Sequence, residues 1–119
     1  MRKVEIGTEK YTQVYACDEK EFNAHHHYSV STTAIPEQGS VILGEVRFQK
    51  GAIKEHGVNG VCNEDLIAMV IDRLQSFQES EFKCRENAIA ITKLEEALLW
   101  LRKRTSDREK RNVEGTHTV

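Results

Sequence analysis

The spacing of hydrophobic positions changes near residue 60. Before that point, β-branched and aromatic residues gather in four short segments, at 2–6, 11–16, 28–35 and 41–48. Short segments of this kind, separated by polar connections such as 36–40, are typical of strands. In the fourth segment the alternation shifts after Gly44, which predicts a β-bulge there. The pattern therefore predicts a small antiparallel sheet over residues 1–58.

Beyond residue 60 the hydrophobic residues recur at helical spacing. Asn63, followed by two acidic residues, is a suitable N-cap for a helix that runs to Phe77. A second helix is predicted to start after Ser80 and to end near residue 105. Its apolar stripe consists of Ala88, Ile91, Leu94, Leu98 and Leu101, widened by Ala90, Ala97 and Trp100. At 1.5 Å per residue the second helix is roughly 36 Å long and the first roughly 21 Å, so the second should overhang.

The link between the two helices is short, which predicts an antiparallel hairpin. Folding the chain back about residues 79–82 places Phe77, Arg85 and Asn87 close together at the closed end of the hairpin. A small sheet and two helices leave this long apolar stripe incompletely covered, which predicts a homo-oligomer. The expected fold class is α+β, with an N-terminal antiparallel sheet followed by a C-terminal two-helix hairpin.

Length and composition limit the classes of protein. A chain of 119 residues with 39% hydrophobic and 30% charged residues fits one globular domain. We expect it to consist of a sheet part (1–58), a hairpin (63–111) and a tail (112–119). The apolar runs are too short for a spanning helix, and the N-terminus lacks the apolar core of a secretory signal. Three cysteines without C-x-x-C spacing fit a reducing compartment, so we expect a cytoplasmic protein.

Charge is distributed unevenly along the chain. The net charge is −2, yet residues 82–111 carry nine basic residues against five acidic ones. Within this stretch Arg104, Arg108 and Arg111 recur at i, i+4 and i+7, so they form one row if the helix continues. Such a row can hold phosphates through paired N–H donors. The simpler interpretation is that basic residues complement the dipole at a helix C-terminus.

Two residues near the predicted closed end carry alternatives that the pattern leaves open. Asn87 lies one turn before Ile91, so an amide interrupts an apolar stripe. It either sets the register of an oligomer seam or reads the polar edge of a ligand such as adenine. Phe77 is either a core residue, the more common role, or a stacking platform for a base.

Other motifs give weaker signals. The triplet His25-His26-His27 invites a metal interpretation, but alternate residues of a strand face opposite sides and no second ligand pair accompanies it. The loop 57–60 resembles an anion site at a helix start, yet two acids in the first turn would repel phosphate. No nucleophile motif is visible. We therefore expect no metal, no cofactor and no catalytic residue.

The run from Arg47 to Thr116 resembles a known family. The segments RFQKGAIKEHGVNGVCNEDLIAMVIDRLQSFQ, FKCRENAIAITKLEEALLWLRKRT and RNVEGT are similar to the phage-encoded Thoeris anti-defence protein one family. The helical part of that family is also similar to the hairpin domain of an anti-CBASS sponge. The resemblance covers about 70 residues, and residues 1–46 carry little of it.

The resemblance implies a sponge and not an enzyme. Such a protein binds the cyclic ADP-ribose isomers made by bacterial TIR-domain enzymes and sequesters them without cleavage, which keeps the effector off. Some members also bind cyclic di- or trinucleotides at separate sites. The implied assembly is a homo-oligomer, either a dimer or a hexamer built as a trimer of dimers. The resemblance implies no membrane and no duplex nucleic acid as partner.

The family motifs also imply a set of ligand-binding residues. Phe77 would stack on adenine, Asn87 would read polar edges, and Arg85 would neutralise phosphate. Residues at the far end of the second helix would hold the diphosphate or a second, larger nucleotide. The full implied set is Phe77, Arg85, Asn87, Ile91, Arg104, Thr105, Arg108, Val113, Glu114, Gly115 and Thr116. Asn112 stands where the family pattern has Gly; if a left-handed backbone is needed there, Asn tolerates it better than most residues.

Two alternatives come from other classes of function. The first is an enzyme that degrades the same signal, which would return a chemically altered ligand. The second is a small nucleic-acid-binding oligomer that uses the basic helix end. Its binding should weaken steeply with salt and saturate with any duplex, whereas a sponge should ignore duplex.

Overall fold

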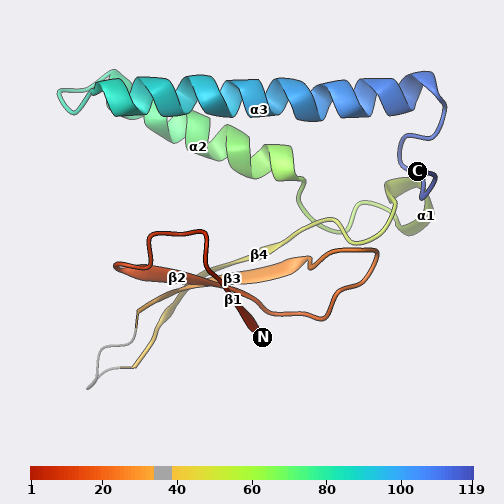
Figure 1. Ribbon diagram of the computed structural model, residues 1–119, viewed down its shortest axis with the longest axis horizontal. Helices are drawn as coiled ribbons and strands as arrows, with labels where there is room; N and C mark the ends of the chain where they lie inside the picture. The colour runs from red at the N-terminus through yellow and green to blue at the C-terminus, as the bar shows by residue number, and fades with distance from the viewer. Residues whose placement is uncertain (34–38) are drawn as a thin grey trace. The chain divides into compact units, whose positions relative to one another are not determined.

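The computed structural model describes residues 1–33 and 39–119 (Figure 1). The chain divides into two compact units, Met1–Val61 and Cys62–Val119. The boundary lies between the predicted sheet part and the predicted hairpin. That the two units together make one domain stays a prediction.

The first unit contains a four-stranded antiparallel sheet. Its strands are β1 (Arg2–Val4), β2 (Thr12–Ala16), β3 (His27–Thr32) and β4 (Ile42–Arg47), and they pair in sequence order. Each strand pairs with the next one along the chain, so the sheet is a meander with β1 and β4 at its edges. The predicted α+β class and the four predicted strands are confirmed. The end of the predicted strand 28–35 and most of the 36–40 connection lie outside the described residues.

The predicted bulge is present in β4. Val30 pairs with Gly44, but the next residue, Ser31, pairs with Ile42, so Leu43 is the extra residue on β4. An unpaired residue next to a glycine is the usual composition of a β-bulge.

Residues 49–61 form a loop held by two side-chain amides. Asn59 accepts from the Lys50 N–H and donates to the Lys50 carbonyl, both at 2.8 Å. Gln49 donates to the Gly57 carbonyl at 2.7 Å and accepts from the Asn59 N–H at 3.0 Å. The loop includes a short helix, α1 (Ile53–His56), which the pattern did not predict. These bonds join the two ends of the loop through its own side chains.

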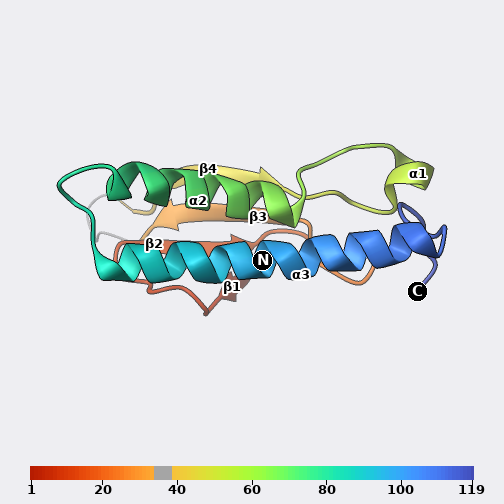
Figure 2. The ribbon, with the colours of Figure 1, turned by 90° about the horizontal axis from the view of Figure 1, so that it is seen from above.

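The second unit is the predicted antiparallel hairpin of α2 (Asn63–Gln78) and α3 (Arg85–Lys110), which Figure 2 shows side by side. The prediction of Asn63 as N-cap was wrong by one residue, because the cap is Cys62. The Cys62 N–H donates to the carboxylate of Asp65 at 2.8 Å, so the acid at the third helical position satisfies the free donor.

The start of the second helix is also later than predicted. α3 begins at Arg85, after Cys84 as N-cap, because residues 79–84 form the connection. Gln78 closes this connection: its amide donates to the Cys84 carbonyl at 3.0 Å and accepts from the Cys84 N–H at 2.9 Å. The Cys84 sulfur in turn accepts from the Asn87 N–H at 3.4 Å. The turn backbone is therefore satisfied by local groups, as a helix start requires.

The predicted overhang is confirmed. α3 has 26 residues and α2 has 16, which corresponds to about 39 and 24 Å at 1.5 Å per residue. The C-terminal turns of α3 therefore extend beyond the start of α2 (Figure 1). The part of the chain that the structure describes contains no helix long and apolar enough to cross a membrane.

Little of the chain is fully buried. Ala16 and Ile71 are the buried hydrophobic residues among those described. The stripe of α3 is half-buried at Ile91, Leu94, Leu98 and Leu101. Trp100 was predicted to widen this stripe, which is wrong: it is 71% exposed. A helix turns about 100° per residue, so Trp100 lies about 100° from Leu101 and farther from the other stripe leucines.

Candidate ligand-binding site

The end of α3 is fixed by a Schellman motif. The Val113 N–H donates to the Arg108 carbonyl and the Asn112 N–H donates to the Glu109 carbonyl, both at 3.0 Å. This pair of bonds requires a left-handed residue after the C-cap Arg111, and Asn112 has φ 59°. The left-handed backbone anticipated at Asn112 is therefore present.

Residues 113–116 then make a tight turn. The Thr116 N–H and hydroxyl both donate to the Val113 carbonyl, at 3.1 and 2.5 Å. Gly115 has φ 74°, a value suited to the third position of a type II turn, where glycine carries no Cβ strain. The VEGT segment is thus a defined turn that follows the helix directly.

Arg108 ties this turn to α3. Its Nη2 donates to the Val113 carbonyl at 3.0 Å and to the Thr116 carbonyl at 3.1 Å. Arg111 donates in the same way to the main-chain oxygen of Val119. Two of the three arginines in the predicted row therefore position the tail in this structure.

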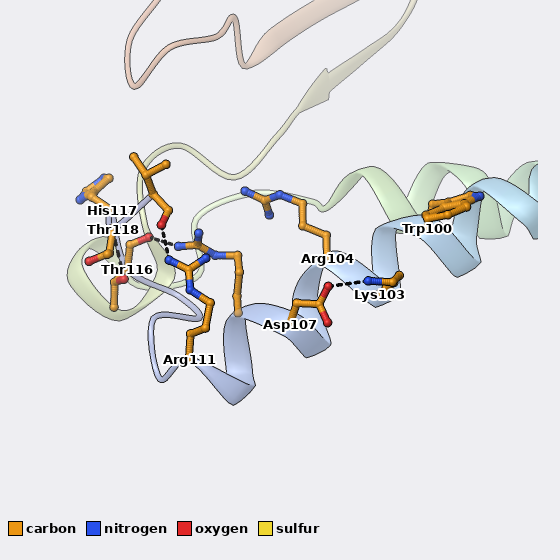
Figure 3. Close-up of a pocket in the computed structure, with 10 residues that line it drawn as sticks. Trp100, Lys103, Arg104, Asp107, Arg111, Thr116, His117 and Thr118 are labelled. Atoms are coloured by element: carbon orange, nitrogen blue, oxygen red, sulfur yellow. Dashed lines mark hydrogen bonds and ion pairs between the residues drawn. The ribbon is translucent and has the colours of Figure 1, made fainter.

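The third arginine, Arg104, is different. Within residues 1–33 and 39–119 its guanidinium makes no hydrogen bond or ion pair, and Figure 3 shows it extending beside the tail. Next to it, Lys103 donates to Asp107 Oδ2 at 2.8 Å. This hydrogen bond lowers the pKa of Asp107; desolvation opposes it, and the charges of Lys103 and Lys110 add to it. Asp107 is thus ionised at neutral pH, and its negative charge balances the positive charge of Lys103. The net positive charge of this region therefore comes from the arginines.

These residues surround a pocket of about 650 Å³ in the second unit (Figure 3). It is lined by Trp100, Lys103, Arg104, Asp107, Arg108, Arg111, Thr116, His117, Thr118 and Val119. An anion entering it would meet a free guanidinium and the unused N–H groups of two more. We call this region the open-end pocket.

The structure brings together only part of the predicted open-end set. Arg104, Arg108 and Thr116 line the open-end pocket. The Thr105 hydroxyl instead donates to the Leu101 carbonyl at 3.3 Å, back along its own helix. Val113, Glu114 and Gly115 form the turn behind the pocket and are half-buried.

The other predicted residues lie at the closed end, where α2 ends and α3 begins. The guanidinium of Arg73 lies 5.4 Å from the centre of the Phe77 ring, a cation–π contact on a side chain that is 39% exposed. Arg85 is the first residue of α3 and Asn87 the third. Among the described residues, the side chains of Arg85 and Asn87 make no hydrogen bond or ion pair, although Asn87 is half-buried. Ile91, one turn later, belongs to the half-buried stripe.

The two ends are far apart within one chain. Seventeen residues of α3 separate Asn87 from Arg104, a rise of about 26 Å. One nucleotide cannot contact both in the same chain. A shared ligand would therefore need a second copy of the hairpin, and otherwise each end holds its own ligand.

The histidine triplet lies in the first unit and is used structurally. His25 Nδ1 lies 2.7 Å from the Asp18 carbonyl oxygen, His26 Nε2 lies 2.6 Å from the Glu21 carbonyl oxygen, and His27 Nε2 lies 3.6 Å from Glu45. His25 and His26 thus contact backbone carbonyls, whereas His27 Nε2 lies near Glu45 without a hydrogen bond. Desolvation would raise the pKa of Asp18, but N–H donors of His26 and His27 and the charge of His25 outweigh it and lower that pKa.

Three residues that shape the two ends of the hairpin were not predicted from the sequence. Gln78 and Arg73 lie at the closed end, and Trp100 lines the open-end pocket. The spacing of Arg73 and Phe77, one helical turn apart, could have suggested a cation–π pair. The Gln78 contact depends on the turn conformation and has no pattern that would reveal it.

Comparison with known proteins gives two matches. Residues 42–106 match the family model described as the hairpin domain of Acb2/Tad1. Over 97% of its length the chain is 52% identical to "Thoeris anti-defense 1" of Bacillus phage SBSphiJ7, and the match covers 96% of that relative. The family match includes α2 and most of α3, so it spans the closed end and reaches Arg104.

Proposed function

Because the chain belongs to the Acb2/Tad1 hairpin family and to the phage Thoeris anti-defence proteins within it, we propose that it is a sponge for a nucleotide signal. Its role is anti-defence against Thoeris. In this proposal it binds cyclic ADP-ribose isomers made by TIR-domain enzymes in the cytoplasm of an infected bacterium. It releases them unchanged, and no residue acts as a catalyst.

One observation carries the proposal: each end of the hairpin presents polar side chains that have no partner among the described residues. Arg85 and Asn87 at the closed end and Arg104 at the open end make no bond within residues 1–33 and 39–119. An amide can pair with the edge of adenine, and guanidinium groups pair with ionised diphosphate. A cyclic ADP-ribose isomer offers both groups in one molecule.

A sponge must bind more tightly than the effector it protects against. Sub-micromolar dissociation constants correspond to about −9 to −12 kcal/mol. Burial of most of the ligand supplies such an affinity, and a pocket between subunits buries more than an exposed helix end does. Exposed apolar side chains on both helices support the proposed homo-oligomer: Val70 on α2 and Ile89 on α3.

The test is a depletion and release experiment. The purified protein is mixed with a panel of cyclic ADP-ribose isomers and cyclic di- and trinucleotides, filtered, and the unbound fraction is chromatographed. The protein is then boiled and the released molecules are chromatographed. We expect depletion of a cyclic ADP-ribose isomer followed by return of the intact molecule.

Other outcomes separate the alternatives. A changed product would make the protein an enzyme that degrades the signal. Depletion of no compound, together with salt-sensitive binding of duplex DNA or RNA, would replace the sponge with a nucleic-acid-binding oligomer. Light scattering of the free and loaded protein checks whether it is a dimer, a hexamer or a monomer.

A further inference from the structure

Trp100 is exposed where a buried residue was predicted. It is the chain's single tryptophan, and 71% of it is accessible. Tryptophan is usually well covered in proteins, because its ring has a large apolar surface. Its position on α3 turns it away from the leucine stripe, so the hairpin itself does not cover it.

The surroundings of Trp100 are charged. At about 100° per residue, Trp100, Arg104, Asp107 and Arg111 lie within about 60° of one another around α3. Arg104 is one turn from Trp100 and has no partner in the part of the chain that the structure describes. Lys103 and Asp107 neutralise each other at 2.8 Å. Arg104 is therefore the arginine of this face whose guanidinium has no partner among the described residues, and it lines the same pocket as Trp100 (Figure 3).

This face differs from the groove on the other side of α3. That groove, of about 750 Å³, lies between the two helices and includes Ile71, Leu98 and Leu99. Trp100 does not line it and lines the open-end pocket instead. An aromatic ring one turn from an unpaired guanidinium fits a base that carries phosphate, because the base can stack and the phosphate can accept from arginine.

We infer that Trp100 is a base-stacking residue of the open-end pocket, on an adenine nucleotide whose phosphate the proposed function already assigns to Arg104. This inference rests on the proposed sponge function and adds to it a residue of the binding site. Trp100 and Asn87 are about 20 Å apart along α3, so within one chain this nucleotide is a different molecule from the one at the closed end.

The single tryptophan provides a direct measurement. Wild-type protein is titrated with a glycocyclic ADP-ribose isomer, with cyclic triadenylate and with ribose 5-phosphate, and the tryptophan fluorescence is recorded. We expect at least one adenine nucleotide to quench the fluorescence in a saturable manner. Ribose 5-phosphate, which has no base, should leave it unchanged.

Variants test whether the ring contributes to affinity. Loss of one stacked base weakens binding by about 10-fold or more, so Trp100→Leu should lose about 10-fold for the quenching nucleotide, measured by calorimetry. Trp100→Phe should retain part of the affinity. Leu99→Ala is the matched control, because Leu99 is 64% exposed but lines the groove on the other face, and it should bind as wild type does.

The outcomes distinguish this inference from the sponge proposal. If wild type depletes and returns a nucleotide, but its fluorescence is unchanged and Trp100→Leu binds equally well, the inference is wrong and the sponge proposal stands. If wild type depletes no nucleotide, both fail. If Trp100→Leu lowers the oligomer mass in light scattering while Leu99→Ala and Trp100→Phe do not, Trp100 is a subunit contact and the inference is overturned.

Discussion

The closed and open ends of the hairpin use similar residues in opposite ways. At the closed end, Gln78 and the Cys84 sulfur satisfy the backbone of the turn, so Arg85 and Asn87 keep their side-chain groups free. At the open end, two of the predicted ligand-holding arginines satisfy the backbone themselves: Arg108 and Arg111 donate to main-chain oxygens of the tail. The comparison teaches that a polar residue near a helix end is a candidate for ligand binding only after the needs of the local backbone are met.

The largest effect should come from a substitution in the interior of the hairpin, because both ends depend on the packing of α2 against α3. Ile71 is the buried residue of α2. Truncating a buried isoleucine to alanine leaves a cavity and costs about 2–5 kcal/mol. Ile71→Ala should lower the free energy of unfolding of the protein by about that amount and weaken ligand binding at both ends.

Urea unfolding followed by circular dichroism, at one fixed protein concentration, measures this change. Met69→Ala is the matched control on the same helix, because Met69 is 62% exposed and should change stability by less than about 0.5 kcal/mol. Equal stability of the two variants would show that Ile71 does not hold the hairpin together.

The next prediction separates ligand contacts at the closed end from structural ones. Asn87→Ala and Phe77→Ala should each weaken binding of a cyclic ADP-ribose isomer by about 10-fold or more, because a paired amide edge or a stacked base contributes about 1–3 kcal/mol. Calorimetry gives the affinities and light scattering the oligomer mass, which should not change. Lys93→Ala, which changes an exposed side chain of α3, is the control. An equal loss of folding in both variants would make them core residues only.

Much of the fold was predictable because it depends on local pattern. Alternation placed the strands, Gly44 marked the bulge, and the length of the second apolar repeat predicted the overhang. The row of three arginines was also correct as geometry, since α3 continues to Lys110. Periodicity alone specified these features, and no tertiary contact was needed to locate them.

What the sequence could not predict depends on tertiary contacts. Equal spacing of Arg104, Arg108 and Arg111 gives no sign that Arg108 binds the Val113 and Thr116 carbonyls while Arg104 binds none. The face of Trp100 was misjudged because tryptophan was counted as apolar. Once α2 is in place, the covered stripe is narrower than the run of apolar residues around it.

A smaller effect should appear at the open end when the hydrogen bonds from Arg108 to the tail are removed. Arg108→Ala removes two hydrogen bonds to tail carbonyls, and a bond from a charged donor contributes about 1.5–3 kcal/mol, less at an exposed site. We expect amide hydrogen exchange of residues 113–119 to become about 10-fold faster, while exchange in the middle of α3 stays unchanged. Arg102→Ala, which removes an arginine on the other face, should leave the tail as it is. Unchanged exchange in Arg108→Ala would show that the turn is stable without the hydrogen bonds from Arg108.

A substitution at the left-handed position that ends α3 tests the open end with a smaller expected effect. Asn112 has φ 59° in the Schellman motif. This left-handed conformation costs most residues with a Cβ atom about 1 kcal/mol, whereas Asn tolerates it and Gly has no Cβ. Asn112→Ala should therefore lower the free energy of unfolding by about 1 kcal/mol, and Asn112→Gly should leave it nearly unchanged. Thermal unfolding of the two variants checks the difference, and equal melting temperatures would contradict the left-handed role.

The smallest effect concerns the charge balance that leaves Arg104 free. The hydrogen bond from Lys103 lowers the pKa of Asp107 below the ordinary 3.8. A carboxyl whose pKa is depressed on folding stabilises the folded state above its unfolded pKa, and this contribution is lost as the pH falls through the folded pKa. Asp107→Asn should therefore be slightly less stable than wild type at pH 7, and the difference should vanish in acid below the folded pKa.

The carboxyl carbon shift of Asp107 in an NMR titration measures this pKa directly. We expect a midpoint below 3.8 in wild type and a higher midpoint in Lys103→Met, because that variant removes the hydrogen bond that contributes most to lowering the pKa of Asp107. A wild-type midpoint at or above 3.8 would mean that Lys103 is not held by Asp107. Lys103 would then compete with Arg104 for a phosphate, and the open end would present two free cations beside Trp100 instead of one.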